Sequence, residues 1–210
     1  MRKYLTELVG TLFFVMTIGL IASRDNAMAP LVIGSALMVV VYMGGHVSGA
    51  HYNPAVSLAL FLRGKLARGD LFPYWIAQLA GGTLGAWLAY VVSDRTFALS
   101  PAAGAGAMTV LLVEALYTCL LALVVLNVAT TKATQGNSFY GLAIGFAVVI
   151  GAWAGGPISG GAFNPAVATG TIVVHALLGS GSWGHLWLYF VGPAAGGVVA
   201  SYVYAMQETA

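Results

Sequence analysis

One ten-residue phrase occurs twice in this chain and interrupts two long apolar stretches. SGAHYNPAVS at residues 48–57 returns as SGGAFNPAVA at residues 159–168, with six of ten positions identical. Each copy places a proline where an apolar helix cannot continue undisturbed. Because the two copies lie 111 residues apart, we expect one domain over residues 1–210, with a first repeat over 1–100 and a second over 101–210.

The composition limits where such a chain can fold. Hydrophobic residues make up 60% of the sequence and charged residues 7%, whereas soluble domains carry about 25% charged residues. So little charge cannot keep a protein surface in water, which predicts a polytopic membrane protein. The net charge of +2 gives no reason to expect a nucleic-acid partner. The single cysteine, Cys119, excludes a disulfide within the chain.

Six apolar segments are long enough, or nearly long enough, to cross a bilayer, which takes about 20 residues. They lie near 4–22, 28–47, 71–93, 108–129, 138–155 and 183–206. Two further apolar pieces begin at Asn-Pro-Ala and are too short to cross, near 53–62 and 164–174. The predicted fold is therefore an all-α membrane protein with six transmembrane helices and two re-entrant half-helices.

The first segment has features of a secretory signal, because basic residues precede an apolar run. Glu7 interrupts that run, and the repeat requires the segment as a helix, so we expect it to be part of the fold. Arg24 and Arg95 fall on one side of the six crossings. The other side has Arg2, Lys3, Arg63, Lys65, Arg68 and Lys132. The positive-inside rule then predicts that both termini are cytoplasmic.

Each half of the chain contains three crossing segments and one half-helix. Because three is an odd number, the second half enters the membrane from the side opposite the first, and the repeat is inverted. Glu7 and Glu114, which lie 107 residues apart within apolar runs, follow the same repeat. Interrupted segments at matching positions of two inverted halves indicate a transport site.

Asn-Pro-Ala is a helix start, because asparagine is a good N-cap and proline suits the first helical position. The two triplets are Asn53, Pro54 and Ala55, and Asn164, Pro165 and Ala166. Two inverted copies would meet N-terminus to N-terminus near the middle of the bilayer. Each start carries about +0.5 of an elementary charge from its helix dipole. We therefore expect this point to repel cations, and the asparagine amides to donate to a passing oxygen.

Several polar residues accompany the triplets. Glu7 and Glu114 are expected to accept hydrogen bonds from backbone N–H groups of the unwound stretches before each triplet. A proton relay or ion site is the alternative, because carboxylates inside a membrane often mark one. His51 has two open interpretations, a vestibule-lining group that responds to pH and a structural hydrogen bond. Tyr74 and Tyr189 are interpreted as interface anchors or packing residues.

Together these features resemble the aquaporin, or major intrinsic protein, family. The resemblance covers essentially the whole chain: the six segments, both NPA boxes, the paired glutamates, AQLAGG at residues 77–82 and WLYFVGPAAGG at residues 187–197. It implies a homotetramer in the lipid bilayer, with one pore per subunit. It also implies a passive channel for water or small neutral solutes, with neither a cofactor nor a metal.

The resemblance also places a second constriction, the aromatic/arginine filter, at four positions carried over by their spacing from the NPA asparagines. These positions are Ile33, Ala152, Gly161 and Val167. Water channels of the family usually have an aromatic residue, a histidine, a small residue and an arginine there. Here isoleucine, alanine and valine replace the aromatic residue, the histidine and the arginine. The resemblance thus implies a wider, more apolar constriction without a fixed cation.

The family markers favour two different permeants. Val167 resembles some plant vacuolar members, which pass water with ammonia, urea or peroxide, whereas Tyr189 and Phe190 are closer to the water-channel type. We expect a passive channel for water and other small neutral solutes. The alternatives are an ammonia, urea or glycerol facilitator with water incidental, and a structural membrane protein with a closed pore. The sequence contains no recognisable catalytic triad, metal cluster or phosphate loop, so we do not expect an enzyme. Short loops favour a prokaryotic inner membrane.

Overall fold

The computed structural model describes residues 1–24 and 26–208, and within these ranges it contains helices and no strand. The long helices are α1 (Arg2–Ala22), α2 (Ala29–Ser48), α4 (Leu71–Ser93), α5 (Ala107–Thr130) and α9 (Leu188–Glu208). The shorter ones are α3 (Pro54–Leu62), α6 (Tyr140–Ala154), α7 (Gly156–Ser159) and α8 (Pro165–Leu178), with 3-10 turns η1 (Arg68–Asp70) and η2 (Lys132–Thr134). In lipid, backbone polar groups must be paired internally, which a helix achieves along its own length.

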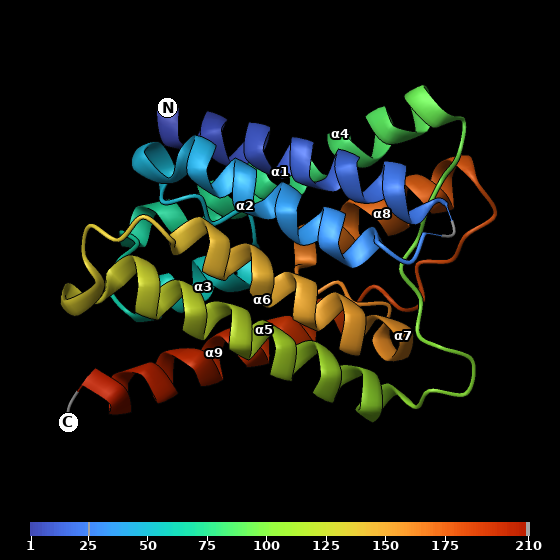
Figure 1. Ribbon diagram of the computed structural model, residues 1–210. Helices are drawn as coiled ribbons and strands as arrows, with labels where there is room; N and C mark the ends of the chain where they lie inside the picture. Colours follow the sequence, from blue (N-terminus) through green and yellow to red (C-terminus); the bar gives the residue numbers. More distant parts are fainter. Residues whose placement is uncertain (25, 209–210) are drawn as a thin grey trace.

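The five long helices are apolar enough and long enough to cross a membrane. The sixth predicted crossing, residues 138–155, is shorter than expected. Helix α6 has only 15 residues, and after Gly155 the chain continues as α7 (Figure 1). The break follows from Pro157 at the start of α7, because proline lacks the N–H that an unbroken helix would use there.

Two other predicted boundaries are wrong. The last crossing begins at Leu188 rather than near residue 183. The intervening residues form turns, in which the backbone N–H of Gly184 bonds to Oγ of Ser182. The second half-helix ends at Leu178 rather than near residue 174. The helix-breaking residue is Gly179, so the polar His175 does not end the helix and is included in it.

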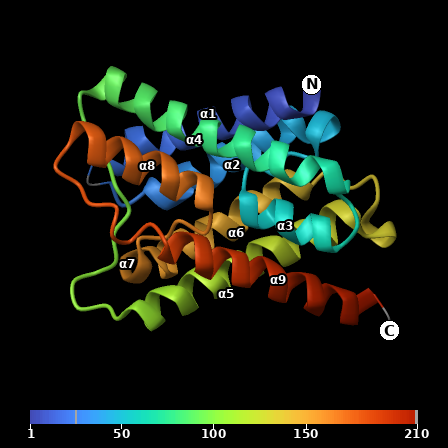
Figure 2. The same cartoon turned by 180° about the vertical axis from the view of Figure 1, so that it is seen from behind.

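The helices pack so that the two halves of the chain interlock. Helix α1 packs along α4, α5 packs along α9, and α2 packs against α6. The half-helix α3 of the first half lies against α9 of the second, and α8 of the second half lies against α4 of the first (Figures 1 and 2). Each half-helix is therefore enclosed by helices from both halves, which places two irregular segments inside the protein and away from lipid.

Helices α2 and α6 cross at a pair of glycines. A Cβ atom built on Gly34 would lie 2.5 Å from the carbonyl oxygen of Gly145, and a Cβ atom on Gly145 would lie 2.5 Å from the carbonyl oxygen of Gly34. Small residues at such a crossing let two backbones approach closely. The two glycines are 111 residues apart, like the two NPA asparagines. Gly34 and Gly145 are therefore matching positions of the two repeats, and the crossing of α2 and α6 joins them.

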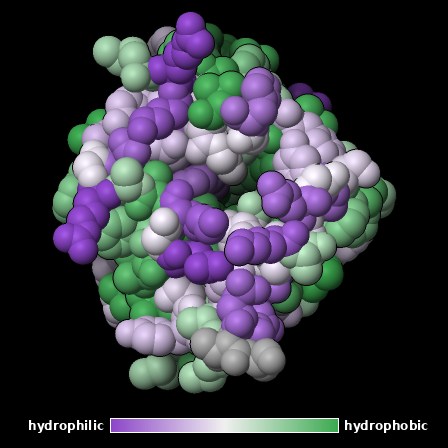
Figure 3. All heavy atoms as spheres, turned by 90° about the vertical axis from the view of Figure 1, so that its left-hand side faces the viewer, coloured by the Kyte–Doolittle hydropathy of each residue, from purple (hydrophilic) through white to green (hydrophobic). Residues whose placement is uncertain are grey.

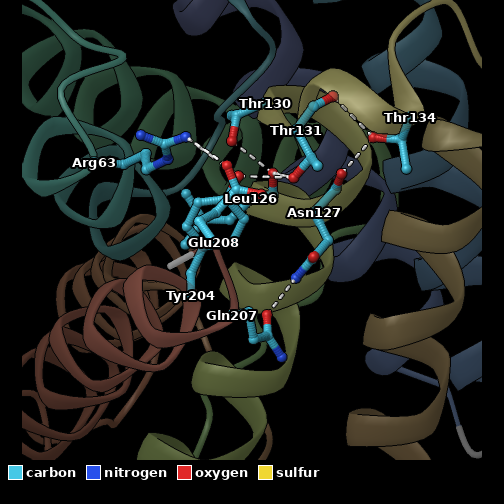
Figure 4. Close-up of polar contacts among 9 residues, drawn as sticks. All are labelled: Arg63, Leu126, Asn127, Thr130, Thr131, Thr134, Tyr204, Gln207 and Glu208. Carbon is cyan, nitrogen blue, oxygen red and sulfur yellow. Dashed lines mark hydrogen bonds and ion pairs between the residues drawn. The ribbon is translucent and has the colours of Figure 1, made fainter. Parts of the chain in front are cut away.

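Both termini and the loop between α5 and α6 lie at one end of the helices, here called the terminal face, and loop 94–106 lies at the opposite face (Figure 1). Figure 4 shows polar contacts at the terminal face. The Tyr204 hydroxyl lies 2.7 Å from Oγ1 of Thr131, and Arg63 bonds to the Glu208 carboxylate at 3.3 Å. Because Arg63 is the C-cap of α3, these contacts tie the end of the first half-helix to α5 and α9.

Candidate transport pore

Both half-helices begin at the asparagine of an NPA triplet. Asn53 and Asn164 have extended backbones, and Oδ1 of each accepts a hydrogen bond at 2.9 Å from the backbone N–H two residues further on, that of Ala55 or Ala166. A proline follows each asparagine at the first helical position. The side-chain oxygens therefore cap their own helices, and the amide nitrogens remain free to contact something else.

The amide nitrogens join the two half-helices. Nδ2 of Asn53 donates to the carbonyl of Phe163, and Nδ2 of Asn164 donates to the carbonyl of Tyr52, both at 2.8 Å. Tyr52 and Phe163 each have a φ of 48°, a left-handed conformation that is uncommon for a bulky residue. Each amide also has a second N–H with no recorded acceptor among residues 1–24 and 26–208, so it can donate to an oxygen in the pore.

Glu7 is fully buried in α1 and binds the first loop. Its carboxylate accepts hydrogen bonds from the backbone N–H groups of His51 and Tyr52, at 3.0 and 2.7 Å. It also accepts from the hydroxyl of Ser48 at 2.7 Å and from the side-chain amide of Gln78 at 2.8 Å. Four donors converge on one carboxylate, and hydrogen bonds to a carboxylate are stronger than neutral ones.

Glu114 has the matching place in the second half. It is fully buried in α5 and accepts from the backbone N–H groups of Ala162 and Phe163, at 3.1 and 2.7 Å, and from the hydroxyl of Ser159 at 2.7 Å. Neither Glu7 nor Glu114 is among the described residues that line the cavity at the NPA asparagines or the cavity at the terminal face. This geometry favours loop support over a proton relay.

A cavity of about 170 Å³ runs from the two NPA asparagines toward the opposite face; it is called the pore cavity below. The four predicted filter residues, Ile33, Ala152, Gly161 and Val167, all line it. Among the described residues, none that lines it is an aspartate, glutamate, lysine or arginine. Apart from the asparagines, His51 and exposed backbone groups, the wall of the pore cavity is almost wholly apolar. The part lined by the four predicted filter residues is called the neck below, and it has no charged side chain.

Gly161 is the filter position with a conformational requirement. Its φ is +70°, in the left-handed region that favours glycine, and a Cβ atom there would lie 3.0 Å from Cα of Gly156. The backbone N–H of Gly161 donates to Oγ of Ser159 at 3.1 Å. A small residue is expected at this filter position, and the left-handed backbone of Gly161 favours glycine there for a separate reason.

Comparison with known proteins agrees with this geometry. The sequence model of the family described as "Major intrinsic protein" matches residues 1–204. The chain belongs to the major intrinsic protein family. It is 38% identical to aquaporin-8 of Mus musculus over 208 residues, which cover 92% of this chain and 77% of the relative. It is 33% identical to aquaporin TIP2-3 of Arabidopsis thaliana over 222 residues, which cover 97% of this chain and 86% of the relative.

The fold is similar to that of a solved structure described as the aquaglyceroporin from Plasmodium falciparum. The TM-score is 0.86 at 22% sequence identity, and the match covers 100% of this chain and 99% of the other. The predicted family and the predicted fold class are thus confirmed. A major intrinsic protein is a multi-pass membrane protein and a passive channel for water and small solutes, and it is not an enzyme.

His51 of this major intrinsic protein has the structural hydrogen bond of one interpretation, and it lines the pore cavity rather than the cavity at the terminal face. Its ring Nδ1 lies 3.0 Å from Oγ of Ser57, and the ring lies 4.9 Å from that of Tyr74, centroid to centroid. The residue is buried, yet it lines the pore cavity. The ring is thus held by a structural hydrogen bond at the wall of the pore.

Two buried tyrosines have a role that the sequence analysis missed. The hydroxyl of Tyr74 donates to the carbonyl of Ser48 at 2.7 Å, and the hydroxyl of Tyr189 donates to the carbonyl of Ser159. Both serines begin an unwound loop, so the tyrosines fix the last helical carbonyl before each NPA triplet. Their spacing of 115 residues, close to the 111 of the triplets, is the signal that could have identified them.

A second cavity, of about 580 Å³, lies at the terminal face. It is lined by residues of α2, the end of α5, the loop between α5 and α6 and the start of α6, among them Gly45, Lys132 and Asn137, and by Lys65 in the loop after α3. Figure 3 shows this face, with hydrophilic side chains gathered around a central hollow. This family member therefore has one cavity with two lysines in its lining at the terminal face and a mostly apolar pore cavity that begins at the two asparagines.

Proposed function

We propose that this pore conducts chiefly water, together with small uncharged solutes such as ammonia and urea. The observation that carries the proposal is the pore cavity, in which two free amide N–H groups are followed by a neck of Ile33, Ala152, Gly161 and Val167. The amides can orient one water molecule at a time in the middle of the membrane. The apolar neck offers a passing molecule few hydrogen bonds, so it holds nothing tightly, which favours flux.

A facilitator of ammonia, urea or glycerol, with water incidental, is the second candidate. It is favoured by Val167, which is buried in the pore wall at the position where the family usually has arginine. An arginine would narrow the neck and bind water through its N–H groups. A valine leaves the neck wider and without donors, which lowers the penalty for larger solutes relative to water.

Exclusion of cations is proposed to depend on the half-helix starts and on the apolar neck. The dipoles of α3 and α8 place about +0.5 of an elementary charge at each NPA triplet. A cation that enters the neck must also lose water without gaining a carboxylate, because no acidic side chain among residues 1–24 and 26–208 lines the pore cavity. Two independent barriers thus replace the single fixed cation of a filter arginine.

We further propose a homotetramer in a prokaryotic inner membrane, with the terminal face in the cytoplasm. Exposed apolar side chains on the long helices, such as Ile76 on α4 and Leu116 on α5, need lipid or another subunit to cover them. The excess of lysine and arginine on the terminal side supports the orientation. Native mass spectrometry of the purified protein tests the assembly, and a major monomer species would contradict it.

Stopped-flow light scattering on proteoliposomes tests the permeant, with sucrose, glycerol and urea gradients in turn. Water permeability well above that of empty liposomes supports the leading proposal. The facilitator is supported if urea or glycerol permeability exceeds that of empty liposomes by a larger factor than water permeability does. Flux equal to that of empty liposomes for every permeant would refute both.

A charge introduced into the neck tests the assignment of the filter. Val167→Arg is expected to lower urea and glycerol flux more than water flux, because it places a bulky, charged donor in the wall of the pore cavity. Leu177→Arg is the matched control, since Leu177 is 68% exposed near the end of the same helix and does not line the pore cavity. Unchanged urea and glycerol flux in Val167→Arg would contradict the assignment.

A further inference from the structure

The loop between α4 and α5, residues 94–106, runs across the opposite face of the molecule (Figure 1). It is anchored on both sides of the pore mouth. Oγ1 of Thr96 lies 2.7 Å from Nδ1 of His175 near the end of α8, and the backbone N–H of Ala102 donates to the carbonyl of Ile158 in α7 at 3.0 Å. These anchors hold the intervening residues over the end of the pore.

Two apolar side chains lie between these anchors, and both line the pore cavity. Phe97 directly follows the anchored Thr96 and is half-buried, and Leu99 is buried with 5% of its surface exposed. A further contact precedes them, because the Arg95 guanidinium donates to the carbonyl of Ser23 at the end of α1. Phe97 therefore belongs to the wall of the same cavity as the four filter residues, although it comes from a loop outside both repeats of the NPA phrase.

We propose that Phe97 is a further specificity-determining residue, which narrows the outer end of the neck against solutes larger than water. This inference depends on the proposed function of the pore. The four filter positions supply no aromatic ring, since Ile33 stands where the family usually has one. A phenylalanine ring is rigid and presents no hydrogen-bond donor on its face toward the cavity. It can therefore reduce the width of the neck without slowing water by binding it.

Removal of the ring gives the direct test. Phe97→Ala is expected to raise the glycerol-to-water permeability ratio about threefold or more in proteoliposomes, because pore width sets the passage of larger solutes. Phe97→Trp is expected to lower the same ratio. Phe139→Ala is the matched control, since Phe139 is 50% exposed, precedes α6 and lines neither cavity. The control should leave the ratio as in the wild type.

The anchor gives an independent test. Thr96→Val keeps the shape of the side chain and removes its hydroxyl, so the ring loses its neighbouring contact with His175. We expect a smaller rise of the ratio than in Phe97→Ala, and no further rise when the two changes are combined, because the anchor acts only through the ring. A merely structural role of the loop would instead lower water and glycerol flux together.

The outcomes separate the two proposals. A glycerol-to-water ratio that stays the same in Phe97→Ala and Phe97→Trp, with water flux intact, would overturn the role of Phe97 and leave the proposed function standing. Absence of any flux in the wild-type protein would overturn both.

Discussion

Replacing Glu114 with leucine removes the acceptor that holds the second unwound loop. Three donors contact this carboxylate, namely the backbone N–H groups of Ala162 and Phe163 and the hydroxyl of Ser159. The hydroxyl already lies 3.4 Å from the carbonyl of Gly155 and can turn to it. The two backbone N–H groups keep no acceptor within the described part of the chain. A buried donor without an acceptor costs about 1–3 kcal/mol.

The expected loss in the free energy of unfolding is therefore about 2–6 kcal/mol for Glu114→Leu, from two orphaned donors. Glu7→Leu should cost about 1 kcal/mol more, because the carboxylate of Glu7 also accepts from the side chain of Gln78. Glu114→Leu should also lower water permeability, since Gly161 lies within the released loop and Val167 follows it in α8.

The measurement is the unfolding of the purified protein in detergent, followed by tryptophan fluorescence, with stopped-flow permeability on the same preparations. Glu208→Leu is the control, because Glu208 forms one partly exposed ion pair with Arg63 and such pairs are worth about 0–1 kcal/mol. The reasoning is refuted if Glu114→Leu unfolds within about 0.5 kcal/mol of the wild type, the usual range of neutral surface changes, and conducts water normally.

Three further changes follow from contacts around the pore. Gly82→Ala should destabilise the protein by about 1–3 kcal/mol, because the new Cβ would lie 2.4 Å from the carbonyl oxygen of Ala166; thermal unfolding checks this against Gly69→Ala, which has open space around it. Tyr189→Phe removes the hydrogen bond to the second loop and should cost about 0.5–1.5 kcal/mol in the same assay, with a lower water permeability. Cys119 lies outside the pore lining, so mercurials should inhibit water flux weakly, and equally in Cys119→Ser; strong inhibition that persists in the variant would be unexplained.

Local signals in the sequence were sufficient for the framework of the pore. Asn53 and Asn164 could be assigned as helix starts because an asparagine cap followed by proline is decided by the next three residues. The contacts of Glu7 and Glu114 with the loops could be expected because a buried carboxylate beside unwound backbone has few other donors to bind. The repeat offset then indicated which glutamate belongs to which loop.

Boundaries and cross-chain contacts were harder to predict. The sequence segment 138–155 looks long enough to cross by hydropathy, but α6 ends at Ala154, and Pro157 lies at the start of the separate helix α7 just beyond the segment. Tyr74 and Tyr189 resemble interface anchors because an aromatic residue with a hydroxyl suits a membrane surface as well as a buried carbonyl. Only the helix packing places their hydroxyls beside Ser48 and Ser159.

The sequence by itself determined that this chain crosses a membrane, that it consists of two inverted halves and that each half breaks at Asn-Pro-Ala. Those features depend on composition and on neighbouring residues, so they can be identified without coordinates. Only the tertiary structure decided that each asparagine amide donates to the loop of the other half, and that Phe97 enters the wall of the pore. The physical reason is distance along the chain: these contacts join residues that local preferences do not connect, and packing alone brings them together.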